Sequence, residues 1–458
     1  MTASKGNPRP LYNPGKGEGT PVGIAVLGHG TVGAQVIRLI NDYADELTER
    51  IGGPLEVKGI AVSDMEKHQD DVPADLLTDD AESLVTRDDV DLVVEVIGGI
   101  DYPRKLVLKA LTSGKSVVTA NKALVAAHWG ELSEAAEAAK VDLFFEAAVA
   151  GAIPVVGPLI RSLAGDKVTR VMGIVNGTTN YILDGMDSQG ASYEEMLAQA
   201  TELGYAEADP TADVEGYDAA SKAAILASLA FHTRVYAKDV YREGITKVTA
   251  ADMAAAREAG YLIKLLAICE RITDESGQEK VSARVHPTLI RDDHPLAGVR
   301  ESFNAVFVEA EAAGRLMFYG RGAGGAPTAS AVVGDIVAAA RNRVFGGRAP
   351  GESSYANLPI ADFGDVVTRF HVDMTVADRA GVLAEIASLF AKANISVSTL
   401  RQEEAPTDVP RQTGNRGGRA RLVVVTHSAH EHDLEAVVEQ LKGLEAVHAI
   451  NSVLRLEA

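Results

Sequence analysis

The stretch VGIAVLGHGTVG, from Val22 to Gly33, decides the fold of the first part of the chain. Its first six residues are apolar and partly β-branched, which predicts a buried strand, and a helical pattern follows to about Arg50. The turn between them has the Gly-x-Gly-x-x-Gly spacing, placed after a strand and at the start of a helix, as dinucleotide binding requires. Gly28 allows the tight turn, Gly30 lets the backbone approach a pyrophosphate, and Gly33 lets the helix pack on the strand. The predicted cofactor residues here are Gly28, Gly30, Thr31, Val32 and Gly33.

Strand-like and helix-like segments alternate after this turn. The predicted strands are 55–62, 91–97, 116–119 and 142–146, and the predicted helices between them include 104–113 and 122–140. Near-continuous apolar strands that alternate with helices indicate a parallel, doubly wound sheet. We therefore expect an α/β dinucleotide-binding domain at residues 21–150.

The residues that follow the second strand should contact the adenosine ribose of the cofactor. Asp64 favours a free 2′-hydroxyl group, whereas Ser63 and Lys67 are suited to a 2′-phosphate. The sequence leaves NAD and NADP both open. His29, inside the glycine turn, either contacts the cofactor or faces solvent.

Beyond residue 150 the pattern of predicted helices and strands changes twice. Residues 151–319 mix longer helices with strand-like runs at 168–175 and 281–289, which predicts an α+β domain for catalysis and dimerisation. A glycine-rich turn at 320–328 and a helix at about 328–342 are expected to complete the first domain. Residues 345–365 are predicted to be a linker, residues 1–20 a disordered tail, and residues 366–458 a β-α-β-β-α-β domain of the ferredoxin-like type. The stretch 405–420 within it is expected to be a hairpin loop.

Composition excludes several functions. The net charge of −20 argues against a nucleic-acid partner, and no apolar run approaches the roughly 18 residues that a membrane span needs. The only cysteine, Cys269, excludes an internal disulfide framework and is typical of a reducing cytoplasm. Because Cys269 lies in an apolar run that we interpret as one face of a helix, we expect a buried thiol and not a nucleophile.

The segment from Gly204 to Lys222 gathers the residues best suited to catalysis. Five acids precede the lysine within fifteen residues, and four of them are the candidates for function: Glu207, Asp209, Asp213 and Asp218. An Ala-rich helix is predicted from Ala219 to Ala230, so Asp218 and Lys222 lie four residues apart on one face. The pair is either a solvated salt bridge or a lysine whose pKa is tuned to donate a proton.

Three turns carry weaker signals, each with two interpretations. Lys122, after the strand that ends at Thr119, is either a generic first residue of a helix or a contact to nicotinamide or substrate. The small residues after Glu146 form either a hinge or a cation site made of backbone oxygens. Asn176 either caps a helix or binds substrate. The His427–His432 cluster has no second ligand set, so we do not expect a metal there.

Taken together, these residues resemble homoserine dehydrogenase, in its longer bacterial form with a C-terminal ACT domain. The resemblance runs from about Val22 to Leu456. It is carried by the motifs Gly28–Gly33, Thr119–Lys122, Glu146–Ile153, Asn176–Tyr181, Gly204–Lys222 and Gly320–Thr328. It implies reversible reduction of L-aspartate 4-semialdehyde to L-homoserine with NADP or NAD, on the route to threonine, isoleucine and methionine, in a homodimer or homotetramer.

The resemblance also assigns roles residue by residue. Lys222 matches the proton donor, Asp218 and Lys122 match its catalytic neighbours, and the substrate contacts are Glu207, Asp213 and Asp218. Gly204, Glu207, Lys122 and Gly322 adjoin the cofactor, with Ser63 and Asp64 at its ribose. A sodium site matches Glu146, Val149, Gly151 and Ile153. One departure is Ala212, which stands where some relatives carry a second acid beside Asp213.

The last domain resembles an ACT module, carried by DRAGVLAEI (Asp378–Ile386) and NIS (Asn394–Ser396). The resemblance implies an amino-acid effector, L-threonine, at the turn made by Asp378, Gly381, Val382 and Leu383. Deleting the residues after about Asp365 is expected to leave activity and abolish inhibition. Two rivals are an aspartate-semialdehyde dehydrogenase, which would need a nucleophilic cysteine, and a non-catalytic amino-acid sensor, which leaves Lys222 and its acids unexplained.

Overall fold

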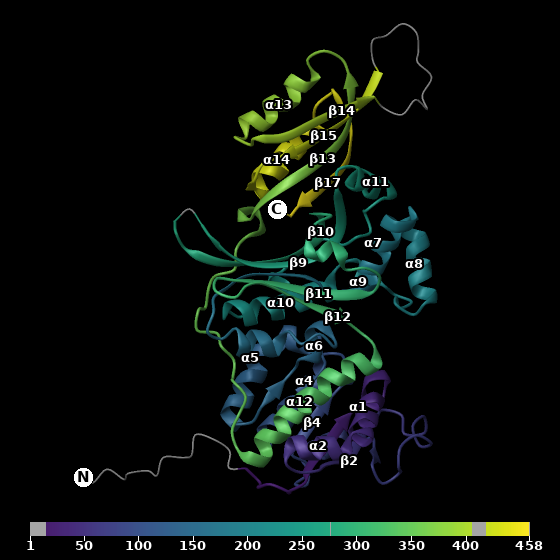
Figure 1. The fold of residues 1–458 in the computed structure, drawn as a ribbon, viewed down its shortest axis with the longest axis vertical. Coiled ribbons are helices and arrows are strands. Elements are labelled where there is room, and N and C mark those ends of the chain that lie inside the picture. The colour runs from purple at the N-terminus through teal and green to yellow at the C-terminus, as the bar shows by residue number, and fades with distance from the viewer. Residues whose placement is uncertain (1–14, 275, 405–417, 458) are drawn as a thin grey trace, which may run out of the picture. The chain divides into compact units, whose positions relative to one another are not determined.

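The computed structural model describes residues 15–274, 276–404 and 418–457, which divide into two compact units (Figure 1). Unit 1 holds residues up to 171, 221–238 and 303–357. Unit 2 holds residues 172–220, 239–302 and 358 onward. Each unit is therefore assembled from segments that are distant in the sequence.

A six-stranded parallel sheet forms the centre of unit 1. Its strand order is β3-β2-β1-β4-β5-β6, and the strands β1 (Val22–Leu27), β2 (Leu55–Ala61), β3 (Leu77–Thr78), β4 (Leu92–Glu95), β5 (Ser116–Thr119) and β6 (Leu143–Phe144) all pair in parallel. The connecting helices are α1 (Thr31–Asp42), α2 (Ala44–Ile51), α3 (Ala81–Leu84), α4 (Asp101–Thr112) and α5 (Lys122–Ala139). The predicted doubly wound sheet is confirmed. The single helical pattern predicted to about Arg50 is two helices, because the chain leaves helical geometry at Tyr43.

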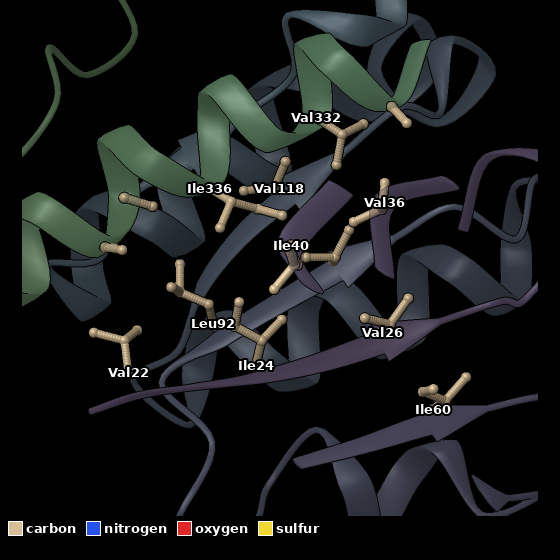
Figure 2. Packing of buried hydrophobic residues seen from close by; sticks show 14 of the residues in the cluster. Val22, Ile24, Val26, Val36, Ile40, Ile60, Leu92, Val118, Val332 and Ile336 are labelled. Carbon is tan, nitrogen blue, oxygen red and sulfur yellow. The ribbon is translucent and has the colours of Figure 1, made fainter. Parts of the chain in front are cut away.

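One face of this sheet is covered by α1 and by a helix from much later in the chain, α12 (Gly325–Phe345). Figure 2 shows Ile24 of β1 in one buried cluster with Ile40 of α1 and Ile336 of α12. Each such side chain contributes about 2 kcal/mol through its removal from water. The helix predicted to return at about 328–342 thus packs on the sheet of unit 1.

The remaining elements of unit 1 follow the sheet or return to it late in the chain. They are α6 (Ala147–Ala150), a π-helical turn (Pro158–Ser162), most of α10 (Tyr217–Phe231), β11 (Phe303–Ala310) and β12 (Gly314–Arg321). The predicted strand at 168–175 is β7 (Val168–Ile174), which runs from unit 1 into unit 2.

Unit 2 begins with helices and a long antiparallel hairpin. Its elements are α7 (Gly177–Gln189), α8 (Tyr193–Glu202), α9 (Thr211–Val214), β8 (Tyr241–Arg242), α11 (Ala250–Glu258), β9 (Tyr261–Thr273) and β10 (Glu279–Arg291). The helix predicted around Cys269 is wrong, because Cys269 lies in β9 opposite Ala283 of β10. The prediction that its thiol is buried is confirmed, since Cys269 is fully inaccessible.

The ferredoxin-like order predicted for the last part of the chain is confirmed. The elements are β13 (Val367–Asp378), α13 (Val382–Lys392), β14 (Val397–Glu404), β15 (Gly418–Thr426), the short β16 (Ala429–His430), α14 (Glu431–Lys442) and β17 (Val447–Leu456). The antiparallel order is β17-β13-β15-β14. In addition, β17 pairs in parallel with β10, through Thr288 with Arg455 and Leu289 with Leu456.

Three predicted irregular segments differ in how far they are described. Residues 405–417 of the predicted hairpin loop and residues 1–14 of the predicted tail lie outside the described residues. Residues 15–20 are described, and the amides of Lys16 and Gly17 donate to carbonyls at the end of α12. The predicted linker at 345–365 has little regular secondary structure, and the Arg348 guanidinium in it donates to Glu137 of α5.

Two kinds of feature are absent from the described residues. Within residues 15–274, 276–404 and 418–457, no helix is long and apolar enough to cross a membrane. In the same part of the chain no three His, Cys, Asp or Glu side chains are grouped to hold a metal. His430 and His432 stack on each other, and each ring contacts a backbone carbonyl of the 364–365 segment.

Candidate active site

The glycine turn of unit 1 is shaped by close backbone approaches. Gly28 has a φ of +104°, and a Cβ there would lie 2.8 Å from Cγ2 of Ile97. A Cβ at Gly33 would lie 2.1 Å from the carbonyl oxygen of Gly28, so α1 packs directly on the turn. By contrast, Gly30 faces open space. Since α1 has no side-chain cap, its first amides are available to an anion, and the turn fits a dinucleotide pyrophosphate.

A buried polar network sits at the carboxyl ends of β4 and β5. Glu95 is fully buried, accepts a hydrogen bond of 2.6 Å from Thr119 Oγ1, and also accepts from the amides of Ile97 and Gly98. Asn121 caps α5 by accepting from the Leu124 amide. This network places Lys122 as the exposed first residue of α5, at the edge of the sheet where ligands bind.

The Glu146 carboxylate is held by the backbone. It accepts three hydrogen bonds of 2.7 Å from the amides of Val155, Val156 and Gly157. The Glu146 amide in turn donates to Asp335 Oδ2 at 2.8 Å. Burial raises the pKa of Asp335 to about 7. Most of the hydrogen-bonding capacity of the Glu146 carboxylate is thus taken up within the turn.

The predicted sodium turn and the predicted cofactor turn at Gly322 touch each other within unit 1. Gly151 has a φ of +59°, and a Cβ there would lie 2.4 Å from the Gly322 carbonyl oxygen. The Ala152 amide donates to the Arg321 carbonyl at 3.2 Å. A Cβ at Gly322 would lie 1.9 Å from Asn304 Nδ2, so only glycine fits there. Val149 and Ile153 are buried beside this contact.

In unit 2, Asn176 brings two of the predicted acids together. Its Nδ2 donates to Asp213 Oδ1 at 2.7 Å and to Asp218 Oδ2 at 2.9 Å. Its Oδ1 accepts from the Thr179 amide, so the predicted helix cap is confirmed. One side chain thus caps α7 and holds a pair of carboxylates. Asp218 is only 6% exposed.

The other acids of the segment stay at the surface. Glu207 is exposed. Asp209 accepts from the Thr211 amide, and hydrogen bonds from Thr211 lower the pKa of Asp209. Gly204 has a φ of +75°, and the segment after it is anchored by Thr178 Oγ1, which donates to the Tyr205 carbonyl.

Lys222 lies one helical turn after Asp218 on α10. The predicted helix is confirmed, and Lys222 is only 7% exposed. A solvated surface salt bridge is therefore the wrong interpretation, because both side chains are buried.

The comparisons with known proteins identify the family. Residues 154–337 match the family model of homoserine dehydrogenase, 28–146 its NAD-binding domain, and 371–446 the ACT domain. A homoserine dehydrogenase of Corynebacterium glutamicum is 68% identical over 98% of both chains, and one of Mycobacterium tuberculosis is 60% identical over 96% of this chain and 99% of its own length. The chain belongs to the homoserine dehydrogenase family. It is accordingly an oxidoreductase with a nicotinamide-nucleotide domain and an ACT domain.

Solved structures of homoserine dehydrogenases have the same fold. That of the Thiobacillus denitrificans enzyme superposes with a TM-score of 0.87 at 36% identity, covering 96% of this chain and 99% of that one. A hyperthermophilic archaeal homoserine dehydrogenase, solved in complex with NADPH, covers 73% of this chain with a TM-score of 0.61 at 27% identity.

The predicted regulatory turn of this homoserine dehydrogenase joins β13 to α13 in unit 2. Gly381 has a φ of +97°, and α13 begins after it without a side-chain cap. Val382 is buried and Leu383 is 39% exposed. Asp378, at the end of β13, accepts from Gln402 Nε2 of β14 at 3.3 Å.

Sequence reasoning missed several polar residues that organise these sites. They are Glu95, Lys264, Asn304 and Asp335. Lys264 is only 1% exposed, and its Nζ donates to Asn180 Oδ1 and to the Val299 carbonyl. An ionisable residue inside an apolar strand run was the available signal for Lys264 and Glu95.

Proposed function

We propose that the chain catalyses reversible hydride transfer between L-aspartate 4-semialdehyde and L-homoserine, in the biosynthesis of threonine, isoleucine and methionine. The observation that carries this is the carboxylate pair held by Asn176, of which Asp218 lies one helical turn before the buried Lys222. When bound, NADP or NAD supplies or accepts the hydride. The remaining chemistry belongs to the side chains of this chain.

The carboxylates recognise the substrate's ammonium group. Asp213 and Asp218 both accept from the Asn176 amide, which holds the two carboxylates together, and a pair of carboxylates is suited to bind an ammonium donor. The exposed Glu207 is proposed as a further contact to substrate and cofactor, beside the backbone of Gly204.

Lys222 handles the proton. Hydride addition to the aldehyde carbon leaves negative charge on oxygen, which a positioned ammonium group stabilises and protonates. In the reverse direction the neutral amine removes the hydroxyl proton. Burial of Lys222 favours this role because an ammonium group stabilises a developing negative charge more strongly away from bulk water. Lys122, at the start of α5, is proposed to contact the nicotinamide end or the substrate.

The cofactor-binding site is proposed to lie along the turns of unit 1. The backbone of Gly28–Gly33 holds the pyrophosphate, Ser63 and Asp64 lie near the ribose, and Gly322 closes the site. A sodium ion is proposed at the carbonyl oxygens of Glu146, Val149, Gly151 and Ile153, where it would stabilise the turn that packs on Gly322. Main-chain oxygens are favoured as ligands because three backbone amides already donate to the Glu146 carboxylate.

L-threonine is proposed as the effector, bound at the turn made by Asp378, Gly381, Val382 and Leu383. We further propose a homodimer or homotetramer in the cytoplasm, because ACT modules act through paired copies.

The decisive experiment follows the absorbance of the reduced nicotinamide while the full-length chain oxidises L-homoserine. NADP and NAD are compared, with and without sodium and with added L-threonine. Turnover that threonine suppresses supports the reaction and the effector. Turnover that threonine does not suppress excludes threonine as the effector. Absence of turnover with both nucleotides refutes the proposed reaction.

A further inference from the structure

Asn176 is a buried asparagine whose side-chain amide has every hydrogen-bonding position filled. It is 5% exposed and lies in extended backbone just before α7. Its Oδ1 accepts from the backbone amide and from the hydroxyl of Thr179, each at 2.9 Å. A backbone amide can only donate, so the atom that faces it must be the oxygen of the asparagine. The two N–H bonds of Nδ2 therefore point to Asp213 Oδ1 at 2.7 Å and to Asp218 Oδ2 at 2.9 Å.

These contacts decide between capping and substrate binding as the role of Asn176. A side-chain amide has two N–H donors and one oxygen with two lone pairs, and all of them are used within the chain. No donor remains for a substrate, so Asn176 can act on a substrate only through the two carboxylates. The amide is also neutral, so it joins the two acids without adding a charge that would cancel theirs.

The tie through Asn176 bridges two separate helices of unit 2. Asp213 belongs to α9, a helix of four residues without a side-chain cap, and Asp218 lies in the first turn of α10. The joint between these helices contains Gly216, which has a φ of +79°. Two carboxylates that lie close together repel each other, and the shared amide opposes this repulsion. Without it we expect the two carboxylates to move apart.

We propose that Asn176 is a positioning residue: its amide holds Asp213 and Asp218 as one binding unit for the substrate's ammonium group. It thereby determines that the chain selects amino acids over the same acids without an amino group. Two carboxylates at a fixed spacing offer an ammonium donor two charge-assisted hydrogen bonds. The inference rests on the function proposed above, since the substrate of that reaction is an amino acid.

Inhibition of L-homoserine oxidation by the full-length chain tests this role. The probes are L-2-aminobutanoate and butanoate, which differ only in the amino group, so the ratio of their inhibition constants measures selection for the ammonium group. Asn176→Ser keeps a hydroxyl that can cap α7 and lacks the two N–H donors. It should weaken inhibition by L-2-aminobutanoate about tenfold and raise the KM for L-homoserine to the same degree, because charge-assisted contacts are lost. Inhibition by butanoate should stay the same, and kcat should change less than KM.

Two further variants separate this role from a structural one. Asn176→Gly also removes the donors, and glycine is accepted at a helix cap, so this variant should show the same loss of selectivity with little change in its thermal midpoint of unfolding. Asn342→Ser is the matched control, because Asn342 Nδ2 donates to Asp142 Oδ2 at 2.7 Å within unit 1. It should leave both inhibition constants and the KM unchanged.

Equal weakening of both probes by Asn176→Ser and Asn176→Gly would show a general distortion of the site, and would overturn the role in selectivity. Unchanged inhibition constants and KM would overturn it too. If the wild-type chain oxidises homoserine but does not distinguish the probes, the carboxylate pair is not the ammonium site, and the inference fails while the proposed reaction stands. Absence of homoserine oxidation by the wild-type chain would instead refute the proposed function, and with it the role of Asn176.

Discussion

At the scale of single residues, Lys222 is the proposed proton donor, and its burial separates it from the surface lysines. Replacing Lys222 with Met keeps the length of the side chain and removes the ammonium group. We expect kcat to fall by about 100- to 1000-fold, because the developing alkoxide loses its acid. Cofactor affinity, followed by the fluorescence of the reduced nicotinamide, should not change.

The exposed Lys238 of the same unit, changed to Met, is the control for this variant. A Lys222→Met chain that retains near-normal kcat would remove Lys222 from the mechanism.

Asp335 is a second residue with a measurable signature. Its pKa is raised to about 7 by burial, next to the Glu146 amide that it binds. The folded chain therefore holds a proton that the unfolded chain releases above about pH 4. This contribution is present at low pH and is lost as the pH rises through 7.

Asp335→Asn keeps an acceptor for the Glu146 amide without a charge. The thermal midpoint of unfolding of the wild-type chain should fall relative to that of Asp335→Asn between pH 4 and pH 8. Above pH 8 the two midpoints should change with pH in parallel. A constant difference across the range would show that Asp335 is ionised when folded.

At the scale of elements, the sequence predicted most of the parallel sheet, because a βαβ unit carries its signals locally. Val22–Leu27 is apolar along its whole length, and the glycine turn and helix follow at once. The run from Tyr261 to Glu270 has the same apolar character, yet it forms a strand where we predicted a helix. Periodicity cannot distinguish the two when both faces of a strand are buried, as they are from Ile263 to Cys269.

The candidate active site was likewise predictable only where its residues lie close together in the sequence. The i,i+4 spacing of Asp218 and Lys222 and the glycine turn could be inferred from neighbouring residues. The long-range partners could not, because nothing near Asn176 indicates that it binds Asp213 and Asp218, about forty positions later. The same holds for Gly151 against Gly322.

The buried lysine of β9 links two elements of unit 2. Lys264 Nζ donates to Asn180 of α7, whose Nδ2 donates to the Glu301 carbonyl. Burial lowers the pKa of Lys264 to about 8, and Asp184 partly opposes this shift. Between about pH 8 and pH 10.5 the unfolded chain binds the proton that the folded chain has released, so stability rises with pH by about 3 kcal/mol.

The Lys264→Met variant should lack this rise in the free energy of unfolding with pH. Urea midpoints measured from pH 8 to pH 10.5 should rise for the wild-type chain relative to the variant. Identical slopes would mean that Lys264 stays protonated in the fold. Since α7 carries the Asn176 cap, the variant should also raise the KM for homoserine more than it lowers kcat.

At the scale of the whole molecule, the ACT domain is joined to its unit by more than a linker. Because β17 pairs with β10, deleting the residues after Asp365 would remove a paired strand from β10 as well as the proposed effector turn. Burial of Arg455 against Glu431, at 2.9 Å, would be lost too. The truncation suggested by the sequence therefore confounds stability with regulation, and a point variant tests regulation better.

Glu243 is the residue to change. Arg455 of β17 donates to Glu243 Oε2 at 2.8 Å. Two residues further on, the Ile245 amide donates to the Val214 carbonyl, the position next to Asp213. A continuous set of contacts thus connects the ACT sheet with a predicted substrate carboxylate, all within unit 2. Such a connection transmits an effector signal only if effector binding and substrate binding each shift the equilibrium between its conformations.

Glu243→Gln should therefore raise the threonine concentration for half-inhibition by about fivefold, while uninhibited kcat stays the same. The buried Arg455–Glu431 pair is retained, so the fold should survive the change. Glu435→Gln is the matched control, because this exposed acid lies 3.9 Å from Arg455 on its other side. Equal threonine inhibition of both variants and the wild-type chain would mean that the signal reaches Asp213 by another route. An equal loss of threonine inhibition in both variants would point to the charge of Arg455 and not to the contact through Glu243.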